Sequence, residues 1–132
     1  MSTVYLYVGT FAAFLAIDAV WLGLVAPKFY SGQIGHLMAP SPNLPAAAIF
    51  YAIYVVGVLV FAVLPADGVG PMRAVALGAL FGFIAYATYD LTNLATLRDW
   101  PILVTVVDLA WGTFLTGSVA LVGYYISQWL AR

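Results

Sequence analysis

Residues 71–96 read PMRAVALGALFGFIAYATYDLTNLAT, an apolar stretch that ends in a polar block containing Asp90 and Asn93. The stretch is long enough to cross a bilayer, since a spanning helix needs about 20 mostly apolar residues. A carboxylate facing lipid costs about 2.5–3.5 kcal/mol. The polar side of this helix is therefore expected to face the interior of a helix bundle.

The composition of the whole chain supports a membrane protein. Hydrophobic residues make up 65% of the 132 residues and charged residues 7%, whereas soluble domains contain roughly half and a quarter. A single soluble core of this size could not bury so much apolar surface, so the lipid bilayer is the expected surrounding. The net charge of −1 indicates no nucleic-acid partner.

Four stretches are apolar and long enough to span. The expected spans cover about residues 4–26, 45–64, 71–96 and 101–130, within a single transmembrane domain over residues 1–132. Proline suits the first turn of a helix, and Pro45, Pro71 and Pro101 fall at such starts. Asp99 is expected to cap the fourth helix. The predicted fold class is an all-α, integral membrane four-helix bundle.

Small residues recur every four positions in the third span, at Ala74, Gly78 and Gly82. Such a stripe lets another helix backbone approach closely. It predicts tight packing inside the bundle, with a homo-oligomer contact as the alternative. The basic residues divide two against two between the membrane faces, so the positive-inside rule gives almost no orientation.

Three aspartates fall inside the expected spans at a common depth. Asp18 lies nine residues before Pro27, Asp90 lies eight residues before Arg98, and Asp108 lies nine residues after Asp99. At 1.5 Å per residue, each carboxylate lies roughly 12–14 Å from the same membrane face. We therefore expect all three to point into one interior cavity.

Aromatic and amide side chains accompany these aspartates. Tyr86 and Asn93 share a helix stripe with Asp90, and D-x-x-W repeats place Trp21 and Trp111 one turn from an aspartate. The predicted ligand-binding residues are Asp18, Asp90, Asp108, Asn93, Tyr54, Tyr86, Trp21 and Trp111. Trp100 and Trp129 are expected in interfacial aromatic belts.

Three ionised carboxylates cannot share a dry site without a partner. The aspartates are expected to share protons with neighbouring hydroxyl groups, to hold a cation, or to bind a cationic or hydroxyl-bearing ligand. For the second case, Asp18, Asp90 and Asp108 are candidate ligands of a divalent metal, with His36 as a weaker candidate. The cofactor is otherwise left open. A structural role as interhelical hydrogen-bonding groups is the alternative.

The longest link, residues 27–44, is rich in turn residues and contains Tyr30, His36 and Asn43. It lies on the same membrane side as the aspartates and is expected to fold over their cavity. The alternative is a mobile, solvated loop.

Several blocks together resemble a family of small bacterial membrane proteins of unknown function with four predicted spans. They are DAVWLG (18–23), KFY (28–30), PNLPAAAIFYAIY (42–54), YATYDLTNLATLRDWP (86–101) and VDLAWGT (107–113). The YDLTNLATL block is the most specific of them. The resemblance implies a multi-pass protein of the bacterial inner membrane and names no activity.

The sequence favours a membrane protein that binds or transports a small ligand, a cation or a proton at its aspartates. One alternative is a membrane enzyme, or an accessory in lipid modification, that uses the aspartates as metal ligands or as general acids and bases. A second alternative is a scaffold. On the first interpretation, Asp90→Asn should leave the fold intact and abolish ligand binding.

Overall fold

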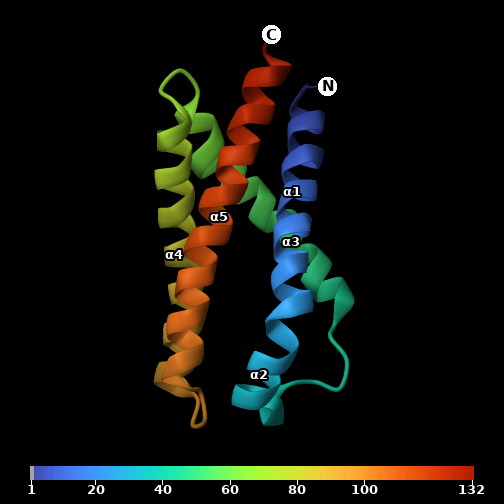
Figure 1. Ribbon diagram of the computed structural model, residues 1–132, viewed down its shortest axis with the longest axis vertical. Coiled ribbons are helices and arrows are strands. Elements are labelled where there is room, and N and C mark those ends of the chain that lie inside the picture. Colours follow the sequence, from blue (N-terminus) through green and yellow to red (C-terminus); the bar gives the residue numbers. More distant parts are fainter. Residues whose placement is uncertain (1) are drawn as a thin grey trace.

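The computed structural model describes residues 2–132, which form a bundle of helices joined by short turns (Figure 1). The elements are α1 (Ser2–Leu24), α2 (Ala26–Ile34), η1 (Gly35–Leu37), α3 (Leu44–Val58), η2 (Leu59–Val63), η3 (Leu64–Ala66), α4 (Pro71–Thr96) and α5 (Ile102–Leu130). Helices α1, α4 and α5, and the continuous Leu44–Ala66 segment, are long and apolar enough to cross a membrane. The predicted all-α class with four apolar helices is confirmed.

The starts of the second and third spans follow the sequence signals. Pro45 and Pro71 lie in the first turns of α3 and α4, where a proline lacks only an N–H that would have no helical partner. Asn43 caps α3, because its side-chain oxygen accepts a hydrogen bond from the Ala46 backbone N–H at 3.1 Å. The prediction that Asp99 caps the fourth helix is wrong, since α5 begins at Ile102 after Pro101 and has no side-chain cap.

The link after the first span contains a helix that the sequence analysis did not predict. Helix α1 ends at Leu24, and α2 begins two residues later with Pro27 in its first turn. Pro27 therefore starts a helix instead of only ending one. This short helix follows α1 and lies at the lower end of the bundle in Figure 1.

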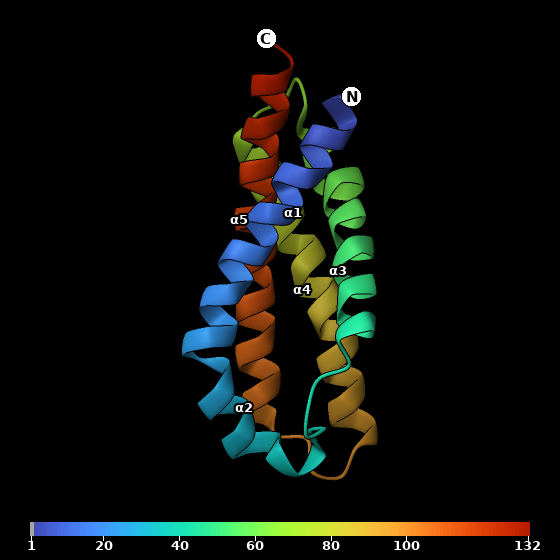
Figure 2. The ribbon, with the colours of Figure 1, turned by 90° about the vertical axis from the view of Figure 1, so that its right-hand side faces the viewer.

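Both chain termini lie at one end of the bundle, as does the turn before α4 (Figure 2). The opposite end carries η1 and the turn between α4 and α5. Helices α4 and α5 form an antiparallel pair, and α1 packs on α5. Helix α3 is tilted, and its continuation η2, one turn of π-helix, packs against α4.

The stripe of small residues on α4 is used inside the bundle. Ala74, Gly78 and Gly82 are all buried. A Cβ atom at Gly78 would lie 2.6 Å from the Cβ of Ala120 and 2.8 Å from the backbone oxygen of Thr116. Close approach of α4 and α5 thus requires glycine there, and the prediction of packing within the bundle is confirmed.

Gly78→Ala is expected to destabilise the protein by about 1–3 kcal/mol, because the added methyl group forces α4 and α5 apart. The measurement is thermal unfolding of the purified protein in detergent micelles. The matched control is Gly23→Ala, where an added Cβ meets nothing within 4 Å. Alanine there should leave the unfolding temperature unchanged or raise it, since glycine inside a helix costs about 0.5–1 kcal/mol. Equal unfolding temperatures for the two variants would contradict this account of the stripe.

Two hydrophobic clusters close the two ends of the bundle. The larger one occupies the half that carries the termini and includes Phe14, Val55, Val58, Leu115 and Val119, all at most 1% exposed. The smaller one joins Ile34 of α2 to Trp100 and Val104 near the opposite end. The layer between them contains the intramembrane aspartates.

Candidate functional site

A cavity of about 260 Å³ lies between the two hydrophobic clusters. All five α-helices contribute to its wall, as does the turn between α4 and α5. The lining residues are Asp18, Trp21, Leu22, Tyr30, Ile34, Phe50, Tyr51, Tyr86, Tyr89, Trp100, Asp108 and Trp111. We call it the aspartate cavity, because Asp18 and Asp108 are its only charged residues.

Asp18 connects three helices through its carboxylate. The side chain is 7% exposed. One oxygen accepts a hydrogen bond from the Tyr51 hydroxyl at 2.9 Å, and the other accepts from Trp111 Nε1 at 3.4 Å. The donors come from α3 and α5, so the carboxylate of α1 is held in place at the cavity wall.

Asp108 is held from the other side by α2. The Tyr30 hydroxyl donates a hydrogen bond to Asp108 Oδ1 and accepts one from Trp21 Nε1 at 3.3 Å. Burial, followed by the bond to Asp108, raises the pKa of Tyr30 above its ordinary value. The hydroxyl therefore stays protonated and remains a donor to Asp108.

Two tryptophans that line the cavity stack on each other. The rings of Trp21 and Trp111 are nearly parallel, 11° apart, with centroids separated by 4.5 Å. Tyr30 packs edge-on against Trp21 at 6.3 Å. The D-x-x-W repeats of α1 and α5 thus bring their tryptophans together and give the cavity aromatic faces beside its carboxylates.

Asp90 lies behind the cavity wall rather than on it. Its side chain is fully buried, and neither carboxylate oxygen receives a hydrogen bond from a donor among the described residues. Its neighbour on α5 is Asp108, whose carboxyl group interacts with it. Because a buried carboxylate without a donor is costly, the geometry favours one proton shared by Asp90 and Asp108.

The expectation that three carboxylates enter one cavity is met only in part. Asp18 and Asp108 line the aspartate cavity, and Asp90 reaches it only through Asp108. Of the other predicted residues, Trp21, Trp111 and Tyr86 line the cavity. The hydroxyl of Tyr54 is turned away from it to Thr116 Oγ1, at 2.8 Å. Asn93 is half-buried on α4 and is not among the lining residues.

The predicted cover of the cavity is correct for one residue of the link. Tyr30 closes the wall beside Asp108. His36 is 53% exposed, with Nε2 3.5 Å from Asp99 Oδ2, and Asn43 is used as the cap of α3. Neither His36 nor Asn43 is among the residues that line the aspartate cavity.

Several lining residues were missed by the sequence analysis. Trp100 is not an interfacial belt residue: it is 7% exposed, donates to Thr105 Oγ1 at 3.1 Å and lines the cavity. Phe50 and Tyr89 also line it. The spacing of Tyr89 from Tyr86, one helical turn, is a signal that identifies it as a neighbour on the same face.

The four candidate metal ligands do not form one cluster in the part of the chain that the structure describes. Among residues 2–132, no group of three or more histidines and aspartates is placed to hold a metal ion. The carboxylate of Asp18 is turned toward Tyr51 and Trp111, whereas that of Asp108 is turned toward Tyr30 and Asp90. These separate sets of partners explain why Asp18, Asp90, Asp108 and His36 do not converge as ligands.

Comparison with known proteins gives one match. Residues 3–125 match the model of a family described as "Predicted membrane protein (DUF2177)". No curated protein and no solved structure matches the chain. The matched range takes in every residue of the aspartate cavity.

Proposed function

Since the chain belongs to this family of predicted membrane proteins, we propose a function from the aspartate cavity itself: it binds a small organic cation, as the binding step of a transporter that exchanges the cation for a proton. One observation carries the proposal. Asp18 and Asp108 line a single aromatic cavity, and no lysine or arginine lines it with them.

The charge of the cavity favours a cationic ligand. All four basic residues of the chain, Lys28, Arg73, Arg98 and Arg132, are exposed at the surface. Two unit charges 4 Å apart attract by about 4 kcal/mol near a protein surface, where the effective dielectric constant is about 20. A cation beside Asp18 and Asp108 would therefore supply the charge partner that the protein itself lacks there.

The aromatic wall favours an organic cation over a metal ion. Trp21, Trp111 and Tyr86 line the cavity together with the carboxylates, and the face of an aromatic ring attracts an ammonium group by about 2 kcal/mol when the pair is desolvated. A metal ion would need several oxygen ligands from one cluster. The cavity offers few carboxylates and many rings, which is the composition expected of an ammonium site.

The pair of Asp90 and Asp108 supplies the proton for the exchange. With the cavity empty, the pair retains one proton and therefore one net negative charge. When a cation binds at Asp108, the pair releases that proton to water, and its second negative charge compensates the bound cation. Charge and atoms balance, since one cation enters the site and one proton leaves it.

The position of the cavity supports a transport role. It lies between two packed hydrophobic clusters, and substrate sites of transporters commonly lie near the middle of the bilayer. We further propose the bacterial inner membrane as its location, from the resemblance of the sequence blocks. A scaffold would need neither the aromatic wall nor the buried carboxyl pair.

The experiment compares tetramethylammonium with neopentyl alcohol, a neutral molecule of similar size and shape. We expect isothermal titration calorimetry of the purified protein in maltoside micelles to show binding of tetramethylammonium only, because the carboxylates attract the charged probe. Binding should become weaker as the solution is made more acidic, since protons compete for the same carboxylates. Equal binding of both probes, or binding of neither, would contradict the proposal.

A further inference from the structure

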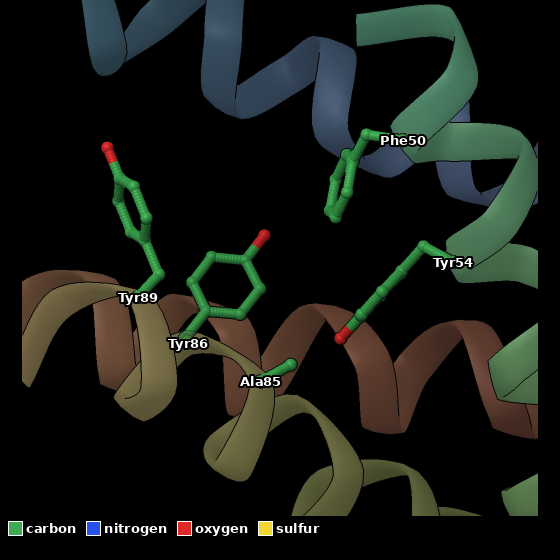
Figure 3. A pocket seen from close by; sticks show the side chains of 5 residues that line it. All are labelled: Phe50, Tyr54, Ala85, Tyr86 and Tyr89. Atoms are coloured by element: carbon green, nitrogen blue, oxygen red, sulfur yellow. The ribbon is translucent and has the colours of Figure 1, made fainter. Parts of the chain in front are cut away.

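A second cavity, of about 350 Å³, adjoins the aspartate cavity. Its lining residues are Phe50, Tyr54, Ala85, Tyr86 and Tyr89 (Figure 3). Phe50, Tyr86 and Tyr89 line both cavities, so the two spaces lie side by side and share these three side chains as a common wall. We call the second one the apolar slot.

The wall of the slot is mainly aromatic, with the Tyr86 hydroxyl pointing into the space between Phe50 and Tyr89 (Figure 3). Figure 3 shows the rings of Phe50 and Tyr54 from α3 and those of Tyr86 and Tyr89 from α4 grouped around it, with the methyl group of Ala85 between them. The hydroxyl of Tyr54 is engaged with Thr116 at 2.8 Å. The slot therefore suits hydrocarbon.

The slot opens toward the lipid between α3 and α4. Phe50 is 47% exposed and Tyr89 is 56% exposed, and both belong to membrane-spanning segments. Helix α4 packs mainly against α5 and η2, whereas α3 packs against α1 and η2. The start of α3 thus leaves α4 uncovered at this depth, and we expect acyl chains of the bilayer to meet the slot there.

Hydrophobic side chains pack both ends of the bundle. One end is filled by the core cluster around Val58 and Leu115, and the other is closed by Ile34, Trp100 and Val104. A ligand reaching Asp108 through the slot would pass only apolar and aromatic surface. Such a path excludes small hydrated ions and favours a molecule already dissolved in the membrane.

We propose that the bound cation is a single-chain amphiphile that enters sideways from the bilayer. Its ammonium head occupies the aspartate cavity, and the first part of its alkyl chain occupies the apolar slot. The inference rests on the proposed function, because it assigns the class of the cation that the aspartates bind.

The test compares octyltrimethylammonium with tetramethylammonium on Ala85→Leu. The larger side chain fills part of the slot, so affinity for the octyl compound should fall about tenfold, the effect of losing the contacts of two methylene groups. Affinity for tetramethylammonium should be unchanged, because this ion has no alkyl chain that could reach Ala85. The measurement is calorimetric titration in maltoside micelles.

The matched control is Ala76→Leu, an exposed position on the same helix, which should bind both compounds as the wild type does. Ala85→Val should give a smaller loss for the octyl compound than Ala85→Leu.

If wild-type protein binds neither compound, the proposed function fails. If it binds tetramethylammonium but Ala85→Leu does not discriminate against the octyl compound, only the assignment of an amphiphile fails. An equal loss on Ala76→Leu, or loss of both compounds from both Ala85 variants, would also overturn that assignment.

Discussion

Asp108→Asn is expected to weaken the binding of tetramethylammonium by about 30-fold or more, which corresponds to about 2 kcal/mol of lost charge attraction. The amide keeps a carbonyl oxygen that accepts the hydrogen bond from Tyr30. The fold should therefore remain intact while the charge is removed. The measurement is calorimetric titration of the purified variant beside the wild type, with thermal unfolding to show that both are folded.

The control for this substitution is Asp99→Asn. Asp99 is 67% exposed in the turn beside His36, outside the aspartate cavity, and its replacement removes the same unit of charge from the chain. Affinity for tetramethylammonium should stay at the wild-type value. An Asp108→Asn protein that binds as tightly as wild type would contradict the proposed site. Equal losses in the two variants would assign the effect to net charge instead.

Much of the fold can be predicted because the bilayer imposes simple requirements. Long apolar stretches must become helices, since every backbone polar group needs a partner within lipid. Pro45 and Pro71 then mark helix starts. Helix α2 could not be predicted in this way, because it has only nine residues and Pro27 fits both the end of one helix and the start of another. Its packing on the α4–α5 turn, through Ile34 and Trp100, decides between them.

The sequence predicted the depth of the site residues in the membrane, but not the neighbours toward which their side chains point. The rise per residue fixes the level of Asp18, Asp90 and Asp108. It does not determine that α4 turns Asp90 toward Asp108 while α1 turns Asp18 toward Tyr51. Those directions depend on helix tilt and on side-chain packing. For the same reason Tyr30 and Trp100, which come from short segments, complete the cavity in a way that periodicity alone does not show.

Asp90→Asn is expected to preserve the fold and the binding of tetramethylammonium but to abolish proton release. From the sequence alone the same substitution was expected to abolish binding. The structure changes this expectation, because Asp90 is fully buried and is not among the residues that line the aspartate cavity. The amide introduced by Asp90→Asn would donate its N–H to Asp108 permanently, replacing a shared proton by a hydrogen bond that does not titrate.

Proton release is measured by titrating tetramethylammonium in buffers that have different heats of ionisation. Wild-type protein should release about one proton for each cation bound, since the bound cation displaces the proton that we propose Asp90 and Asp108 share. Asp90→Asn should release none, and its affinity should fall less in acidic solution than that of the wild type, because only direct competition by protons at Asp18 and Asp108 remains. The other groups that interact with Asp90 are Tyr30 and Tyr89, which remain present in the variant. Asp18→Asn provides the contrast, because it should bind more weakly and still release a proton. A proton released from Asp90→Asn would have to come from a group outside the carboxyl pair, and exchange at Asp90 and Asp108 would then be wrong.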